Sequence, residues 1–139
     1  MNKLILTVGL PRSGKSTWAK QQGLPIVRPD AIRMELYGQR FWERGEKMVW
    51  SIVDVMVRSL FTAGNTSVIL DATNLSVKYR WDWYSSEWET YFKTFDTDVD
   101  TCVKRAKEAG YDDLVDVIID MNDLMDELDE WETKMRYEG

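Results

Sequence analysis

The feature that most constrains this chain is an octapeptide near its start, Gly9–Ser16 (GLPRSGKS), which matches the Walker A pattern G-x-x-x-x-G-K-[ST]. Its glycines let the backbone turn tightly, so that successive amide N–H groups point inward at phosphate oxygens. A helix directly after the motif would add the partial positive charge of its N-terminus. The pattern predicts that Lys15 reaches the β- and γ-phosphates of a nucleotide and that the Ser16 hydroxyl ligates Mg²⁺.

The segments on both sides of the octapeptide have the character that this interpretation needs. Lys3–Val8 (KLILTV) is an apolar run typical of a buried strand, and Thr17–Gln22 is expected to be helical up to Gly23. The alternative is a chance match in an ordinary turn, which the coincidence of strand, motif and helix disfavours. We therefore expect ATP and Mg²⁺ as cofactors. The residues expected to bind the nucleotide are Gly9, Pro11, Arg12, Ser13, Gly14, Lys15, Ser16 and Thr17.

The rest of the chain alternates short apolar runs with segments of helical periodicity. Further strands are predicted at Pro25–Arg28, Ser67–Leu70 and Phe92–Phe95. Helices are predicted at Asp30–Tyr37, Arg40–Ala63, Ser76–Glu89 with Ser76 as N-cap, Val99–Lys107 and Asp113–Met135. Strands separated by helices imply parallel βαβ units. The predicted fold class is α/β: a P-loop NTPase three-layer αβα sandwich with a short parallel sheet of four or five strands, residues 1–139 forming a single domain.

The residue types that are absent or rare exclude several kinds of chemistry. The chain has no histidine and one cysteine, Cys102, which excludes Ser-His-Asp and Cys-His catalysis, histidine-ligated metals and an internal disulfide. Any general base must therefore be a carboxylate, a lysine or a tyrosine. No apolar run is long enough to cross a bilayer and the N-terminus lacks a signal-peptide pattern, so we expect no membrane partner and a cytoplasmic location.

Charge is unevenly distributed along the chain. Residues 1–50 contain nine Lys/Arg against four Asp/Glu, a balance of +5, and residues 51–139 contain nine against twenty, a balance of −11, which together give the net charge of −6. The basic part includes the predicted phosphate site, as expected for an anion-binding surface. The acidic part argues against wrapping a long duplex, because nucleic-acid affinity depends largely on neutralising phosphates.

Two aspartates follow predicted strands and are candidates for the site. Asp71 ends the run SVIL, and beside the first strand it would lie near Ser16 and hold Mg²⁺ through water; the alternative is a turn-forming aspartate. Asp30 follows the second strand at the same edge of the sheet, and we predict that it accepts the proton of an acceptor hydroxyl. Arg33, one helical turn later, could hold an acceptor phosphate. The alternative for Asp30 and Arg33 is an N-cap with an i,i+3 ion pair.

Three further features leave a functional and a structural interpretation open. The basic cluster Lys104, Arg105 and Lys107 could neutralise the γ-phosphoryl group, with Arg105 as the best candidate, or form a solvated helix end. The aromatic group Trp81, Trp83, Tyr84 and Trp88 could stack on bases or pack in the core. The predicted last helix is amphipathic, with an apolar stripe best explained as core, an acidic stripe best explained as a solvated face, and self-association into a homo-oligomer as a possibility.

In their order, these segments resemble the kinase domain of phage polynucleotide kinase and its relatives among small P-loop kinases. The matching segments are Leu4–Ala19 (LILTVGLPRSGKSTWA), Asp30-x-x-Arg33, Asp71–Leu75 with Arg80, and Val103–Arg105 followed by Asp116–Ile118. The resemblance implies a 5′-hydroxyl kinase that uses Mg-ATP and acts on a nucleotide or a nucleic-acid end. It implies Lys15 and Ser16 at the phosphates, Asp30 as base, Arg33 on the acceptor phosphate, Asn74 in the acceptor site, and an arginine-bearing lid over ATP.

The chain departs from the family pattern at two positions. The second lid arginine of the family falls on Ala109, which leaves Arg105 and Lys107 as its replacements, and the aspartate of the family's D-T-N-L segment falls on Ala72, so that Asp71 must act from one position earlier. These departures keep other acceptors open: a hydroxymethyl base in DNA, a nucleoside or a small polyol. A different class of function also stays open, an ATPase switch that acts on a protein partner through the acidic C-terminal helix.

Overall fold

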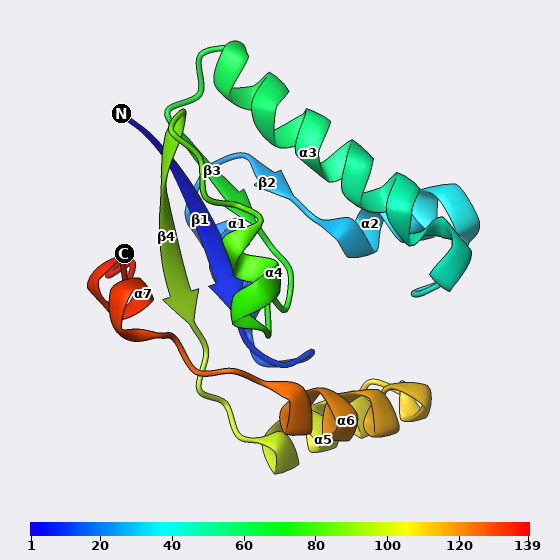
Figure 1. The fold of residues 1–139 in the computed structure, drawn as a ribbon. Coiled ribbons are helices and arrows are strands. Elements are labelled where there is room, and N and C mark those ends of the chain that lie inside the picture. The colour runs from blue at the N-terminus through cyan, green and yellow to red at the C-terminus, as the bar shows by residue number, and fades with distance from the viewer.

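The computed structural model describes residues 1–139 as a parallel four-stranded sheet with helices on both faces (Figure 1). The strands are β1 (Asn2–Val8), β2 (Ile26–Val27), β3 (Ser67–Leu70) and β4 (Trp88–Thr94), in the spatial order β2-β3-β1-β4. β1 is central and pairs with β3 and β4, so that Leu4 lies between Val68 and Thr90. The predicted α/β class and its short parallel sheet are confirmed, with four strands.

Seven helices surround the sheet. They are α1 (Lys15–Gln21), α2 (Pro29–Tyr37), α3 (Glu46–Thr62), α4 (Val77–Trp81), α5 (Val99–Glu108), α6 (Val115–Leu124) and α7 (Glu130–Lys134), with single 3₁₀ turns η1 (Glu43–Gly45) and η2 (Asp112–Leu114). None of these helices combines the length and the apolar character that a membrane span requires. In Figure 1, β1 and β4 point down toward α5 and α6, which lie beyond the carboxyl ends of the strands.

The core is divided between the two faces of the sheet because side chains alternate along β1. Leu4 and Leu6 belong to the larger cluster, which includes α3 through Val49, Val53 and Val57. Ile5 points to the other face and packs with Ala19 of α1. This two-sided burial holds α1 and α3 on opposite faces and leaves the carboxyl edge free for ligands.

The predicted helix Arg40–Ala63 is wrong at its start. α2 ends at Tyr37 and is capped by Gly38, which has the left-handed φ of 67°, and regular α-helix resumes only at Glu46. The intervening segment is shaped by packing around Tyr37, whose ring lies 4.9 Å from that of Trp42 and so close to Gly45 that a Cβ there would stand 2.3 Å from it. The apolar residues near position 41 match helical spacing, but this local packing overrides it.

The predicted helix Ser76–Glu89 is also too long. Ser76 is the N-cap, as expected, and its hydroxyl accepts a hydrogen bond from the Tyr79 amide at 3.2 Å. The helix ends at Trp81, and β4 begins at Trp88, which pairs with Asn2. The strand predicted at Phe92–Phe95 therefore starts four residues earlier and ends at Thr94, because pairing with β1 extends over the whole of that strand.

The predicted single helix Asp113–Met135 is broken into η2, α6 and α7. Met125 is extended, the amide of Asp126 donates to the carbonyl of Leu75 at 2.8 Å, and Asp129 begins α7 with a capping box. The apolar stripe is divided accordingly: Ile118 is buried with Leu10 and α5, while Leu128 and Met135 pack on the main core. The continuous amphipathic helix on which possible self-association was based does not form.

Candidate active site

The loop Gly9–Ser16 joins the central strand β1 to α1. Arg12 and Gly14 have φ values of 68° and 104°, left-handed conformations that turn neighbouring amides toward one side of the loop. A Cβ at Gly9 would stand 2.9 Å from the Ser13 hydroxyl oxygen and 3.0 Å from Cβ of Phe95, so only glycine fits there. The loop thus has the tight concave shape that a chain of phosphates requires.

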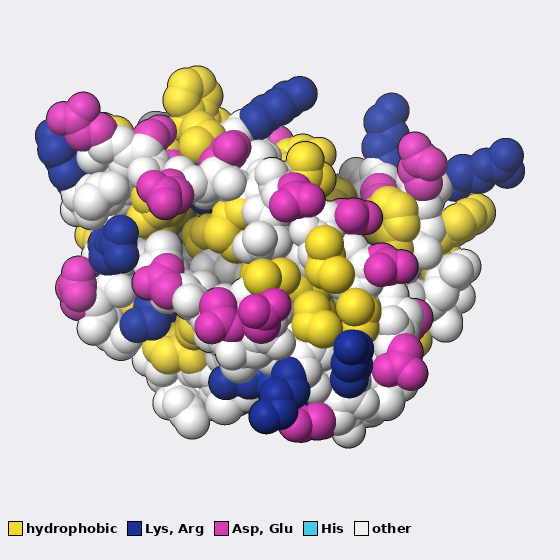
Figure 2. Space-filling model, turned by 90° about the horizontal axis from the view of Figure 1, so that it is seen from below, with side chains coloured by type: hydrophobic (Ala, Val, Ile, Leu, Met, Phe, Trp, Pro, Cys, Tyr) yellow, Lys and Arg dark blue, Asp and Glu magenta, His cyan; other side chains and the backbone are white.

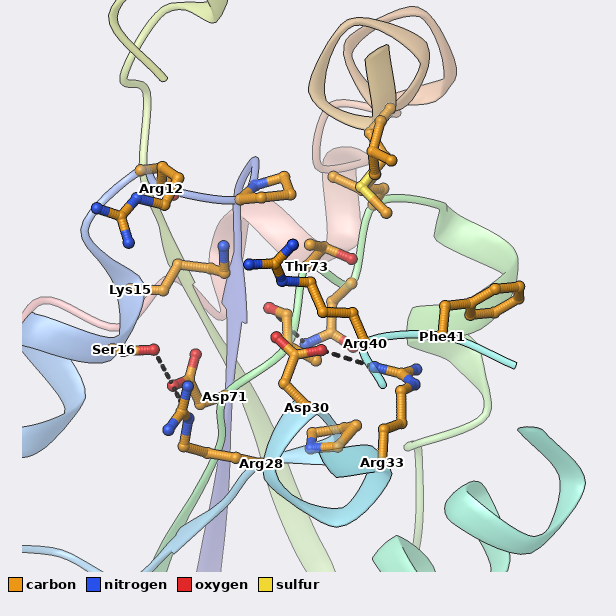
Figure 3. A pocket seen from close by; sticks show the side chains of 18 of the residues that line it. Arg12, Lys15, Ser16, Arg28, Asp30, Arg33, Arg40, Phe41, Asp71 and Thr73 are labelled. Atoms are coloured by element: carbon orange, nitrogen blue, oxygen red, sulfur yellow. Dashed lines mark hydrogen bonds and ion pairs between the residues drawn. The ribbon is translucent and has the colours of Figure 1, made fainter. Parts of the chain in front are cut away.

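Lys15 extends from the start of α1 into the pocket beneath the loop (Figure 3). Its side chain is buried, and its ammonium group donates to the carbonyl of Leu10 at 2.6 Å. Burial lowers the pKa of Lys15 to about 8, against the opposing effect of the carboxylates of Asp71 and Asp30. A buried ammonium with one carbonyl partner is well suited to an anionic ligand, which would restore its charge.

Ser16 and Asp71 meet at the carboxyl end of the sheet. The Ser16 hydroxyl donates to Oδ2 of Asp71 at 2.7 Å, and Nε of Arg28 lies 3.2 Å from the same oxygen. Because β3 ends at Leu70, the alternation of faces along the strand no longer governs Asp71, and its carboxylate can turn to the phosphate loop. A hydroxyl and a carboxylate are the hard oxygen donors that Mg²⁺ prefers, so these two residues fit a magnesium ion completed by phosphate and water.

Asp30 lies in the first turn of α2, directly after β2, and Arg33 lies one turn later. Nη1 of Arg33 donates to Oδ1 of Asp30 at 2.8 Å, while both carboxylate oxygens of Glu46 accept from Arg33 at 2.8 and 2.7 Å. The Asp30 side chain is 74% exposed, whereas that of Arg33 is 13% exposed. The i,i+3 ion pair does form, and it leaves the second carboxylate oxygen of Asp30 facing the pocket (Figure 3).

The segment α5–α6 lies over the phosphate loop. Nη1 of Arg105 donates to the carbonyl of Arg12 at 3.1 Å, and the hydroxyl of Thr97 donates to the carbonyl of Ser13 at 2.9 Å. Lys104 points to solvent and lies 4.0 Å from Glu108. Of the basic cluster, Arg105 is thus the member that reaches the phosphate loop.

One open groove of about 2360 Å³ is lined by residues 11–16 of the phosphate loop and by Arg28, Asp30, Arg33, Asp71 and Arg105. Its walls are the phosphate loop, the segment from Arg28 to Arg33, the α2–α3 loop, the segment after β3, and α6. Figure 2 views the molecule from the side of the carboxyl ends and shows basic, acidic and apolar side chains interspersed on this face. This mixture differs from the continuous basic surface typical of proteins that wrap a duplex.

Comparison with known proteins places the chain in a family. A family model described as an AAA domain matches residues 4–130. The chain belongs to this AAA domain family. Within it the chain is a P-loop kinase-like domain of the α/β type, similar to polynucleotide kinase.

Three solved structures are similar to this AAA domain. A chain of a Pnkp1/Rnl/Hen1 complex is 34% identical with a TM-score of 0.66, over 75% of this chain and 38% of that one. A chain of a Pnkp1/Rnl/Hen1 RNA repair complex is 27% identical with a TM-score of 0.67, over 90% and 46%. A gluconokinase from Sinorhizobium meliloti 1021 shares the fold at 19% identity and a TM-score of 0.61, over 92% and 78%. The AAA domain thus spans less than half of the first two chains.

Asn74, expected in the acceptor site, lines the groove and also makes a structural contact within the chain. Its side-chain amide donates to the carbonyl of Thr7 at 2.8 Å, it is buried, and its φ is 45°. The fully buried Arg80 donates to the carbonyls of Asn74 and Leu75. Its Nε also pairs with Oε2 of Glu132 at 2.7 Å. These contacts fasten the segment after β3 to β1 and to α7.

Sequence reasoning missed several polar residues of the AAA domain. The missed residues form ion pairs: Arg28 pairs with Asp71, Glu46 with Arg33, and Glu132 with Arg80. Each partner lies 13 or more positions away in the chain. A lone charged residue carries no signal of such a partner. For the aromatic group, Trp83 and Trp88 are buried in the core and Trp81 is exposed, which favours packing for the first two.

Proposed function

We propose that this chain is an ATP- and Mg²⁺-dependent kinase that transfers the γ-phosphate to a hydroxyl group, in first place the 5′-hydroxyl of a nucleic-acid end or of a nucleotide. One observation carries the proposal: an open carboxylate, Asp30, and a buried ammonium group, Lys15, face one groove from beyond the carboxyl ends of β2 and β1. A site that only hydrolyses ATP has no need of a carboxylate fixed by an arginine beside an open acceptor space.

In this proposal the donor half of the site holds the triphosphate. The amides of the phosphate loop and the ammonium group of Lys15 bind the β- and γ-phosphates, and Arg105 approaches them from the segment α5–α6, which acts as the lid. Mg²⁺ held by Ser16 and Asp71 would neutralise charge on the phosphates. Removal of water under the lid strengthens each of these interactions, because they act at a lower effective dielectric.

The acceptor half supplies the base. The free oxygen of Asp30 takes the proton as the hydroxyl oxygen bonds to the γ-phosphorus, and the bond from that phosphorus to the bridging oxygen breaks to release ADP. Arg33 fixes the other oxygen of Asp30 at 2.8 Å. The carboxylate is thereby oriented before the acceptor arrives, which reduces the entropic part of the barrier.

Two lines of support favour a nucleotide or a nucleic-acid end as acceptor. The similar chains at 34% and 27% identity come from Pnkp1/Rnl/Hen1 complexes, one of them described as an RNA repair complex. The mixed charge around the groove suits a strand end better than a long duplex (Figure 2).

One contact favours a second candidate, a small neutral acceptor such as a polyol or nucleoside. Glu46 occupies Nε and Nη2 of Arg33, and Asp30 occupies Nη1. With two carboxylates on one guanidinium, this corner of the groove is negative, and an acceptor phosphate would have to displace one of them.

The test is transfer from γ-labelled ATP to a panel: a 5′-hydroxyl oligonucleotide, nucleoside 3′-monophosphates, nucleosides, hydroxymethylated DNA, small polyols, and water alone. Labelling of the oligonucleotide above all others supports the first proposal, and labelling of neutral acceptors alone supports the second. Release of phosphate to water with no labelled acceptor would contradict both.

A further inference from the structure

Arg40 lies across the groove from the phosphate loop, on the loop between α2 and α3. Its guanidinium carbon stands 4.4 Å from the centre of the Tyr111 ring, and its Nη1 forms an ion pair with Asp113. Figure 3 shows Arg40 and Lys15 extending into the same space from opposite walls, with Asp30 beside them. Arg40 therefore brings a positive charge to the place where donor and acceptor meet.

Three guanidinium groups of the groove pair with a carboxylate, and the ion pair of Arg40 is the most exposed of the three. Arg28 pairs with the buried Asp71, whose side chain is 3% exposed, and Arg33 pairs with Glu46, which is 21% exposed. The side chains of Arg40 and Asp113 are 39% and 66% exposed. Water screens an exposed ion pair, so a phosphate dianion can compete for Arg40 far more easily than for the other two.

We propose that Arg40 is a catalytic residue, which leaves Asp113 and binds the γ-phosphoryl group of ATP during transfer, opposite Lys15. This inference rests on the proposed kinase function and adds a residue to it. A planar guanidinium can bind two phosphoryl oxygens at once and so neutralise charge that spreads over them in the transition state. The ring of Tyr111, in the connection between α5 and η2, packs against Arg40 and so helps to place its guanidinium.

The experiment compares four variants: Arg40→Ala, Arg40→Lys, Asp113→Asn and Arg44→Ala. Arg44→Ala is the matched control. It removes one arginine charge from the adjacent η1 turn, and Arg44 does not line the groove. Each is assayed for binding of ATP and of ADP by calorimetry, and for the kcat and KM of transfer to the best acceptor. Thermal unfolding checks that each variant is folded. We expect Arg40→Ala to fold normally, because the Arg40 side chain is 39% exposed.

For Arg40→Ala we expect affinity for ATP to fall about tenfold while affinity for ADP stays unchanged, because only ATP has the γ-phosphate. We expect kcat to fall about 100-fold, with Arg40→Lys intermediate. Arg44→Ala should retain the wild-type preference for ATP and the wild-type kcat. Asp113→Asn should bind ATP at least as tightly as the wild type, because it removes the carboxylate with which the γ-phosphate competes for Arg40.

Three results would overturn the inference: equal losses in Arg40→Ala and Asp113→Asn, which would make the pair a structural contact; a change in acceptor KM alone; or no change. Should the wild-type chain bind ATP but phosphorylate no acceptor, the kinase proposal fails by itself. The ATP-to-ADP affinity ratio of Arg40→Ala then still decides whether Arg40 contacts the γ-phosphate.

Discussion

The donor and acceptor halves of the groove are built in different ways. The donor half is a contiguous octapeptide between the central strand and α1, with Lys15 only 8% exposed. The acceptor half is assembled from α2 and α3, where Asp30 is open to solvent and Arg33 is fixed by Glu46, 13 positions away. The first depends on backbone conformation, and the second on a network of side chains.

This difference matches the ligands that each half has to bind. Phosphate oxygens are alike in every nucleoside triphosphate, so one local arrangement of amides and a lysine suffices. Acceptors differ in shape and charge, and a network of exchangeable side chains can be adapted to each of them. We therefore expect variants in the two halves to have separable effects.

The largest expected effect separates the halves directly. Asp30→Ala should lower transfer by about 10³-fold, because the acceptor hydroxyl loses its base, while ATP binding is retained. Lys15→Ala should weaken both ATP binding and transfer. Binding is measured by calorimetry and transfer with labelled ATP, with Asp30→Asn as an isosteric companion. A fully active Asp30→Ala variant would show that the roles are wrongly assigned.

A second variant should affect both halves by loosening the segment after β3. Glu132→Gln leaves the fully buried guanidinium of Arg80 without its counter-charge and should lower the free energy of unfolding by about 3 kcal/mol. Denaturant unfolding measures this change. Glu130→Gln, an exposed neighbour in α7, is the control and should be close to neutral. If the two variants were equally stable, the buried pair would not be the anchor that its geometry indicates.

A third variant tests the acceptor half alone. Glu46→Gln keeps the shape of the side chain but removes the charge that holds Arg33, so Asp30 should lose its fixed orientation and transfer should fall about tenfold. ATP affinity should stay at the wild-type value. Exposed Glu43 in the η1 turn provides the control substitution Glu43→Gln. An equal loss of ATP affinity in Glu46→Gln would remove the separation between the halves.

The smallest effect concerns the donor half and pH. The pKa of Lys15 is lowered to about 8 by burial, so above pH 8 the empty site increasingly holds a neutral amine. A bound triphosphate favours the charged form and raises this pKa, so ATP binding near pH 8.5 should take up a fraction of a proton. Calorimetry in two buffers of different ionisation enthalpy measures the uptake. In Lys15→Met it should vanish; uptake that persisted would have to come from another group.

Where the sequence predicted the structure, short contiguous signals were sufficient. The strand before the octapeptide, the helix after it, the strand Ser67–Leu70 and the N-cap Ser76 were all expected from neighbouring residues. The contact between Ser16 and Asp71 was also expected, because parallel strands bring their carboxyl ends to one edge.

Where prediction was wrong, long-range pairing had overridden local pattern. Aromatic residues around Trp88 match helical spacing, yet seven residues of β4 pair with β1. The last helix has a continuous apolar stripe, yet it breaks where Asp126 bonds to the carbonyl of Leu75. Local periodicity records which faces are apolar, and it does not record which partner will cover them.

By itself, the sequence determined the fold class and the phosphate loop, because a glycine-rich turn between a strand and a helix depends on the conformation of adjacent residues. Only the tertiary structure decided which distant side chains meet in and beneath the groove: Glu46 behind Arg33, Arg80 paired with Glu132, and Arg40 across from Lys15. Those residues are far apart in the chain, and only the folded structure determines which of their charges lie close enough together, and sufficiently buried, to interact strongly.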